Sequence, residues 1–266
     1  GGHIRRMVAY TNSSEIFPTV EIKGGICYYL EENQYKGLCD YVLIQNGKTL
    51  SARRNLDDYD IFIRDTQLSE IIKKVQKKAL MDGVKMVEEI ISSDTPFGIP
   101  TNPKKSSKNP IEVRPTKDEE FNIELVYIDH LIRKTEYVRE KDITKNVVDI
   151  HRPKVFIPKA GGTGNDSKIL GNPTIGKSGS VCSQTFLYAK FDTEQEAKNF
   201  ITYLKTKFLR VLVSAIKNTQ DAMNGVYHFV PMQDFSEPWT DEKLYAKYGI
   251  TPEEQAYIES LIKPME

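Results

Sequence analysis

The stretch that most constrains the fold runs from Lys154 to Phe186, where two apolar, strand-like runs enclose a long polar loop. The runs are residues 155–157 and 181–188. Glycine lets a backbone approach a ligand closely, and lysine suits phosphate oxygens. The pattern therefore indicates either an anion-binding loop or a long flexible hairpin loop with solubilising lysines. The glycines and lysines concerned are Gly161, Gly162, Gly164, Gly171, Gly176, Gly179, Lys159, Lys168 and Lys177.

Inside this loop, residues 171–178 read GNPTIGKS and match the nucleotide-binding pattern G-x-x-x-x-G-K-[ST]. That pattern holds phosphate only between a strand and a helix, because the helix N-terminus supplies part of the binding. Here Gly179 and a β-rich run follow. We therefore predict that these residues do not form a nucleotide-binding loop.

Composition limits the kind of partner. Lys+Arg and Asp+Glu each number 37 among 266 residues, so the formal net charge is zero. Any nucleic-acid contact must then come from local patches. Cys27, Cys39 and Cys182 are too few and too scattered for a disulfide framework or a zinc site, and they fit a reducing cytoplasm. No run approaches transmembrane length and none reads as a signal peptide, so we expect a cytoplasmic protein without membrane contact.

The first section, to about residue 63, is β-rich. We expect strands at residues 3–10, 19–22, 25–30, 39–45 and 49–52, with a last short apolar run at 61–63. Turns are expected at Lys23-Gly24 and at Asn46-Gly47, a strong hairpin signal. Because residues 4–10 read as a strand already under way and no initiating Met precedes them, we expect a fragment of a longer protein.

Helical spacing follows in residues 68–75 and is broken at Gly83, after which a second short helix is expected from Val84. Residues 95–110 read as a linker or exposed loop rich in proline, serine and lysine. A second β-rich section spans 121–188, with a strand expected at 121–128.

The clearest helix begins at a capping box, Thr193-x-x-Glu196. One helix could run from Glu194 to about Lys217, or two helices could meet near Thr206. Its basic side chains indicate a solvated face or, alternatively, a phosphate-facing one. A second capping box at Thr251 predicts a small helical pair, residues 241–248 and 252–262, separated by Gly249. The basic side chains of the long helix are Lys198, Lys205, Lys207, Arg210 and Lys217.

A search for catalytic patterns finds little. The four histidines, at positions 3, 130, 151 and 228, lack metal-ligand spacing, and we interpret them as structural or surface residues. Two triplets, residues 21–23 and 241–243, fit a loose D/E-x-K nuclease pattern, which arises readily by chance in a charged chain. The N-P-P-[YF] signature of amino-methylating DNA methyltransferases is missing, and with it the aromatic ring on which a flipped base stacks.

Four segments carry a resemblance to a family. Residues 17–30, FPTVEIKGGICYYL, resemble the late sheet hairpin of adenine-specific DNA methyltransferases in bacterial restriction-modification systems. Residues 154–186 and 218–230 resemble the target recognition domain of the same large proteins, which is similar to the DNA-reading domains of type I specificity subunits. Residues 239–265 resemble the C-terminus of fused, type IIG restriction enzymes.

The resemblance implies an α+β fragment in four parts. These are a tail of a methyltransferase-like sheet (1–63), a helical segment with a linker (64–115), a mixed target recognition domain containing the long helix (116–236), and C-terminal helices (237–266). The catalytic half is absent, so the resemblance assigns no catalytic residue and no cofactor to this fragment. It implies S-adenosylmethionine, and optionally Mg²⁺, for the parent protein.

The implied partner is double-stranded DNA, together with the missing catalytic part or other restriction-modification subunits. Phosphate contacts fix register, and polar side chains read base edges. A second polar cluster, which also fits an ordinary helix C-terminus, follows the long helix. Phosphate candidates are Lys159, Lys168 and Lys177, with the N–H groups of Gly161, Gly162 and Gly164; base-reading candidates are Thr163, Asn165, Asn172 and Gln184; the second cluster is Lys217, Asn218, Thr219 and Gln220.

Two other functions stay open from the sequence. One is a metal-dependent nuclease that uses Glu21 and Lys23, or residues 241–243. The other is a docking module that joins the methyltransferase to other subunits, which apolar surface without a basic groove would favour.

Overall fold

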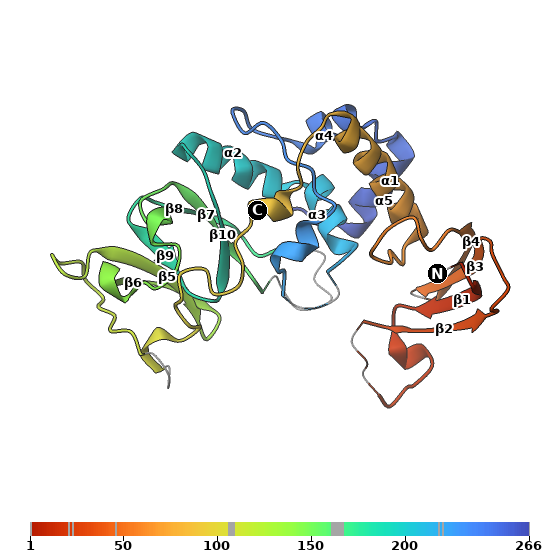
Figure 1. The fold of residues 1–266 in the computed structure, drawn as a ribbon, viewed down its shortest axis with the longest axis horizontal. Coiled ribbons are helices and arrows are strands. Elements are labelled where there is room, and N and C mark those ends of the chain that lie inside the picture. The colour runs from red at the N-terminus through yellow and green to blue at the C-terminus, as the bar shows by residue number, and fades with distance from the viewer. Residues whose placement is uncertain are drawn as a thin grey trace. The chain divides into compact units, whose positions relative to one another are not determined.

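The structure is a computed structural model, and it describes residues 2–20, 22, 24–45, 47–105, 110–160, 168–217, 219 and 221–265. The chain divides into two compact units, Gly1–Lys73 and Lys74–Glu266. Strands and helices occur in separate blocks along the chain (Figure 1), which confirms the predicted α+β class. The four-part division predicted from the sequence stays a prediction.

The first unit contains a four-stranded sheet in the order β2-β1-β3-β4. β1 pairs antiparallel with β2 and parallel with β3, and β3 and β4 form the hairpin expected around Gly47. One face of the sheet is buried by Met7, Ala9, Cys39, Tyr41 and Leu43. The strands are β1 (Ile4–Tyr10), β2 (Ile26–Glu31), β3 (Cys39–Gln45) and β4 (Lys48–Arg54), and a 3-10 helix (Ser13–Glu15) follows β1.

The strand expected at residues 19–22 is wrong for the residues described there. Ser13 explains the difference, because its hydroxyl donates to the Val20 carbonyl (3.3 Å) and accepts from the Ile22 amide (3.0 Å). Backbone groups used in this way are not available for a ladder, and β2 pairs with β1 instead. Of the expected turn, Lys23 lies outside the described residues.

The apolar run at residues 61–63 is not a strand. Ile63 is buried, and its carbonyl accepts a hydrogen bond from Arg54 (2.8 Å). The run therefore contributes buried Ile63 to the first unit as an irregular segment.

Helix α1 (Thr66–Met81) confirms the helical spacing, and Gly83 follows it with φ +63°. The second short helix is reduced to a 3-10 helix (Val87–Glu89). The Val87 amide donates to the Val230 carbonyl (2.8 Å), and Met86 forms a β-bridge with Pro231. Because the backbone at residues 86 and 87 is paired with residues 230 and 231, the segment forms only a 3-10 helix and not a full α-helix.

The second unit contains two three-stranded sheets, in the orders β6-β5-β9 and β10-β7-β8 (Figure 1). The run at 181–188, expected to be one strand, forms two, because the chain turns where the Phe186 amide donates to the Ser183 carbonyl (3.1 Å). One hydrophobic cluster draws on strands of both sheets. The strands are β5 (Ile123–Asp129), β6 (Ile132–Val138), β7 (Lys154–Pro158), β8 (Thr174–Gly176), β9 (Ser180–Cys182) and β10 (Phe186–Lys190).

The long helical segment is two helices that meet at Thr206. Thr206 ends α2 (Glu194–Lys205) and caps α3 (Lys207–Ser214), where its hydroxyl accepts from the Leu209 amide. The capping boxes at Thr193 and Thr251 are both present. The C-terminal pair is α4 (Asp241–Tyr248) and α5 (Pro252–Leu261), and the remaining 3-10 helices are Pro103–Lys105, Glu140–Asp142, Val147–Asp149 and Asn224–Tyr227. Within the described residues, no helix is both long and apolar enough to cross a membrane.

Candidate nucleic-acid interface

The two ends of the glycine-lysine loop pack against each other, and we call residues 158–160 and 168–172 the loop base. A Cβ added at Gly171 would lie 2.8 Å from the ring of Pro158 and 3.1 Å from the Ala160 carbonyl. A contact this short with a ring and a backbone atom cannot relax easily, so glycine is required here. The loop therefore leaves and re-enters the fold at one closely packed place.

The re-entering segment of the loop base, residues 168–172, is strained and anchored. Ile169 has φ +65°, a conformation that β-branched residues rarely adopt. It forms a tight turn in which the Leu170 amide donates to the Lys168 carbonyl (2.7 Å). The same carbonyl accepts from Arg210 of α3 (3.2 Å). Strain held by surrounding contacts is a feature of functional sites.

The segment after α3 lies beside the loop base. Ala160 forms an antiparallel bridge with Asp221, and the Ala222 amide donates to the Lys159 carbonyl (2.7 Å). The structure therefore brings Lys159 and Ala160 beside the two residues that follow the second polar cluster, although about sixty positions separate them in the sequence.

Two of the candidate residues share one carboxylate. Asp94 accepts from the Lys159 ammonium (2.7 Å) and from the Gln184 side-chain amide (3.1 Å). Partial burial opposes ionisation of Asp94, but these two donors outweigh it and hold the pKa of Asp94 below its ordinary value. The side chain of Lys159 is only 13% exposed, so its ammonium holds Asp94 in place beneath the surface.

The other described candidates lie at the surface near the loop base or on the turn that follows it. Asn172 and Lys168 are exposed at the point of re-entry. Lys177 is exposed between β8 and β9, at the end of β7 away from the loop base, because Gly176 pairs with Lys154. Lys217 reaches the carbonyl of exposed Thr219 (3.0 Å). The candidates Gly161, Gly162, Thr163, Gly164, Asn165, Asn218 and Gln220 lie outside the described residues.

Arg133 of β6 is a cation that the sequence reasoning missed. Its guanidinium donates to the Asn172 carbonyl (2.9 Å) and lies 5.4 Å from the ring centroid of Phe186. Partial burial lowers the pKa of Arg133. Within the described part of the chain it forms no ion pair, so its charge is not neutralised locally. Arg133 belongs to no recognisable sequence motif, and the strand that carries it, β6, was not predicted.

The nucleotide-binding pattern at residues 171–178 is followed by a strand, as the sequence indicated. Thr174–Gly176 forms strand β8 and is followed by a turn and strand β9. Gly176 is needed because a Cβ there would meet Phe156 at 2.7 Å and Lys154 at 2.6 Å. Gly176 of the motif therefore allows β8 to pack against β7, and strand β9 follows the motif in place of a helix N-terminus.

The basic side chains of the long helical segment differ from expectation at Arg210. We expected either a solvated or a phosphate-facing side chain, but Arg210 is fully buried. Its apolar helix neighbours place that position on the core side, and carbonyl oxygens satisfy its guanidinium there. Lys207 pairs with Glu259 of α5.

The second nuclease triplet has a structural role. Both oxygens of Asp241 accept from amides at the start of α3, those of Lys207 (3.0 Å) and Phe208 (2.8 Å). Lys243 pairs with Glu237 (2.8 Å). Among described residues, no group of three His, Cys, Asp or Glu could hold a metal ion. The first triplet depends on Glu21 and Lys23, which are not described.

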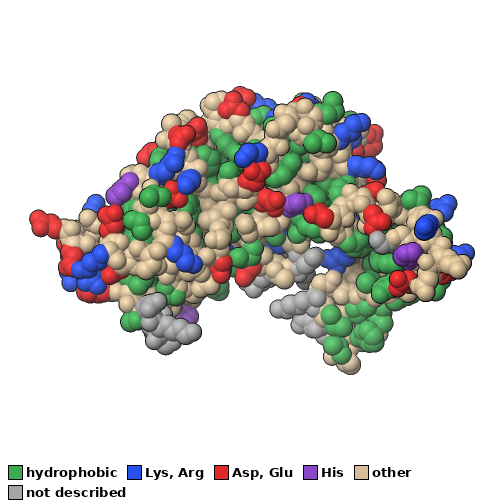
Figure 2. Space-filling view, viewed as in Figure 1, with side chains coloured by type: hydrophobic (Ala, Val, Ile, Leu, Met, Phe, Trp, Pro, Cys, Tyr) green, Lys and Arg blue, Asp and Glu red, His purple; other side chains and the backbone are tan. Residues whose placement is uncertain are grey.

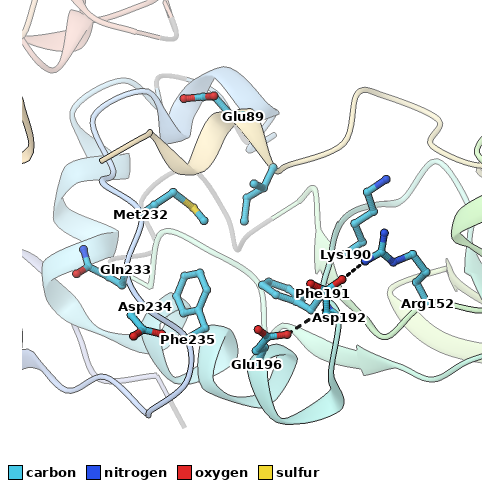
Figure 3. A pocket seen from close by; sticks show the side chains of 11 residues that line it. Glu89, Arg152, Lys190, Phe191, Asp192, Glu196, Met232, Gln233, Asp234 and Phe235 are labelled. Carbon is cyan, nitrogen blue, oxygen red and sulfur yellow. Dashed lines mark hydrogen bonds and ion pairs between the residues drawn. The ribbon is translucent and has the colours of Figure 1, made fainter. Parts of the chain in front are cut away.

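A cavity of about 500 Å³ opens elsewhere in the second unit. Figure 3 shows Arg152 and Lys190 on one side of it and Gln233 and Asp234 on the other. Its charges are engaged within the fold, since Arg152 pairs with Asp192 and Lys190 pairs with Asp149 (3.0 Å). The cavity includes no candidate residue from the sequence. Its lining is Glu89, Ile90, Arg152, Lys190, Phe191, Asp192, Glu196, Met232, Gln233, Asp234 and Phe235.

Surface charge is mixed. On the face drawn in Figure 2, Lys and Arg are interspersed with Asp and Glu over the described residues. This agrees with the balanced composition. A phosphate-binding surface must therefore depend on a few placed cations and not on a broad basic field.

Comparisons with known proteins find a distant structural likeness. No family model matches the chain, and no curated protein matches its sequence. The solved structures that match include the type IIG restriction endonuclease BpuSI, with a TM-score of 0.40 and 9% identity over 98% of this chain. The chain spans 39% of the length of that protein. A likeness this distant carries no functional argument, so the resemblance to restriction-modification proteins stays a prediction beyond it.

Proposed function

We propose that this chain is the DNA target-recognition part of a bacterial restriction-modification protein and that its loop base lies against duplex DNA. The observation that carries the proposal is the convergence of Lys159, residues 168–172, Lys217 and Arg133 at one place. Cations from three separate segments gather there around a strained and anchored backbone. Such a surface suits phosphate contacts that fix the register of a duplex.

The described residues divide into two roles in this proposal. Lys168 and Arg133 contact phosphates beside the loop base, and Lys177, at the other end of β7, contacts a phosphate farther along the duplex. Asn172 and Thr219 read base edges, since amides and hydroxyls can pair with bases. The proposal gives Gln184, whose side-chain amide donates to Asp94 (3.1 Å), the same task. The proposal includes the undescribed loop candidates, residues 161–165, 218 and 220, and it assigns S-adenosylmethionine chemistry, with optional Mg²⁺, to the rest of a parent protein.

The test is binding to duplex DNA across a salt series. We expect affinity to fall steeply with salt, because each phosphate contact releases counterions. Removing Arg133, Lys168 and Lys177 together as alanine variants should lower affinity at least ~10-fold at low salt and reduce the slope of log K against log salt by about 2 to 3. Fluorescence anisotropy with a labelled 30-bp duplex of random sequence measures both quantities.

A charge-matched control separates local contacts from net charge. Replacing Lys85, Lys198 and Lys243 by alanine removes the same charge from other exposed segments. This control should bind DNA with nearly unchanged slope. Equal losses in both triple variants, or no binding by the unmodified chain at any salt, would contradict the proposal.

The first unit favours docking to another protein surface as a second function. Strand β2 lies at the sheet edge, and Tyr28, Tyr29 and Leu30 are each more than half exposed. Phe17 and Val20 are also about half exposed, and Figure 2 shows hydrophobic side chains gathered on this unit. An exposed apolar edge strand is a template for strand addition. We infer that β2 pairs with a strand of a parent protein or of another restriction-modification subunit.

This docking surface predicts self-association when no partner is present. Replacing Tyr28 and Leu30 by lysine should weaken self-association at least ~10-fold, since charge on an edge strand opposes pairing. Sedimentation velocity over a concentration series measures the effect. Leu80→Lys, at an equally apolar and 82% exposed position, is the control. A chain that is monomeric throughout the series would argue against a docking edge.

A further inference from the structure

The hairpin that joins β5 to β6 ends in an unusual tip. Asp129 pairs with Ile132, so His130 and Leu131 form a two-residue turn, with φ of +48° and +67°. Turns of this kind favour Asn-Gly or Gly-Gly, because side chains at positive φ are strained. Here the second position holds a leucine that is 97% exposed, and Ile132 beside it is 62% exposed.

The tip therefore combines two costs that a purely structural turn would avoid. A glycine at position 131 would relieve backbone strain, and a polar side chain would suit solvent. A single exposed apolar side chain is common on protein surfaces. An exposed leucine that also strains its own turn indicates a contact with something outside the described chain.

The chemistry around the tip favours a polyanion as that contact. Arg133, two positions after Leu131, carries no ion pair within the described residues and donates to Asn172 of the loop base (2.9 Å). The next residue of β6, Lys134, pairs across the hairpin with Asp129 of β5 (2.6 Å). The tip thus presents exposed Leu131 two positions from Arg133. The hydrogen bond from Arg133 to Asn172 places the tip beside the proposed DNA surface.

We infer that Leu131 is an apolar wedge that inserts between base steps of duplex DNA while Arg133 holds the adjacent phosphate. Apolar side chains used in this way unstack a base step and bend the duplex, and the bend brings more DNA against the protein. The inference rests on the proposed DNA-binding function and adds a named residue and a named deformation to it.

The decisive variant is Leu131→Gly, because glycine suits the positive φ at this position and should leave the thermal unfolding midpoint unchanged or higher. The probe is a duplex enriched from a random-sequence pool by the unmodified chain, with a fluorophore at each end. We expect the Kd of the variant to rise about 10-fold at fixed salt, with an unchanged salt slope, since phosphate contacts remain. The rise in energy transfer that reports bending should disappear.

Leu80→Ala removes a comparably exposed leucine and should change neither affinity nor bending. If Leu131→Gly binds and bends the duplex as the unmodified chain does, the wedge is overturned, the DNA-binding proposal stands, and the apolar tip serves a protein contact. If the unmodified chain enriches no duplex and binds none, the wedge and the DNA-binding proposal are both overturned.

Discussion

Replacing Arg210 by methionine should destabilise the second unit by about 3 to 5 kcal/mol, a cost typical of breaking a buried polar network. Arg210 is fully buried, and its guanidinium donates to main-chain carbonyls from three segments. Methionine fills similar volume but leaves those buried acceptors unpaired. The acceptors are Thr206 (3.2 Å), Lys168 (3.2 Å), Lys263 (2.7 Å) and Lys205 (3.1 Å).

Urea denaturation measures this loss as a lower midpoint with an unchanged slope. Arg210→Lys should lose most of the same stability, because an ammonium cannot reproduce the planar, forked donors. Lys207→Ala, which removes the neighbouring ion pair with partly exposed Glu259, is the control and should cost no more than about 1 kcal/mol. A midpoint for Arg210→Met within the range of this control would show that the guanidinium is not a structural anchor.

Lys154 should make stability depend on pH in the alkaline range. It is fully buried, and its ammonium donates to the carbonyls of Ile150 (2.8 Å) and Ser180 (3.2 Å). Burial lowers the pKa of Lys154 to about 8, although Cys182 and Asp149 nearby favour the charged form. A chain that must bury this charge at neutral pH is destabilised by it.

The direction follows from proton binding. Between pH 8 and about 10.5 the unfolded chain keeps the proton of Lys154 while the folded chain releases it, so stability rises with pH. Below pH 8 both states are protonated and the penalty is constant. From pH 7 to pH 10 this group should add roughly 2.5 kcal/mol to the unfolding free energy.

Lys154→Met and Lys154→Gln both lack this contribution. The unfolding free energy of either variant minus that of the unmodified chain should therefore fall by roughly 2.5 kcal/mol from pH 7 to pH 10. The two variants differ in hydrogen bonding, so their absolute stabilities should differ while their difference curves run parallel. A difference that does not change with pH would mean that Lys154 is charged in the folded chain throughout this range.

Local signals in the sequence were sufficient for most elements. The Asn46-Gly47 turn, the stripe at 68–75, and the capping boxes at Thr193 and Thr251 act within a few residues, and the structure confirms each described feature. The β-rich run expected after the nucleotide-binding pattern is likewise present, as strand β9.

The wrong or missing strand predictions lie where residues distant in the sequence decide how the backbone pairs. The strand expected at 19–22 is replaced by bonds to Ser13, and the run at 181–188 is split between two sheets. Strand β6 was missed because much of it is charged and exposed, and its pairing with β5 and with Arg114 supplies what its own residues do not signal. A hydroxyl or a neighbouring strand that competes for backbone groups leaves no mark in the local pattern.

By itself the sequence determined the α+β class, the helix boundaries set by caps, and a loop rich in glycine and lysine, because each depends on near neighbours. Only the tertiary structure decided which of these residues meet. It placed Asp221 and Ala222 beside Lys159 and Ala160, set Arg133 against Asn172, and buried Arg210. Those contacts join positions far apart in the chain, and their geometry follows from how the sheets and helices pack together.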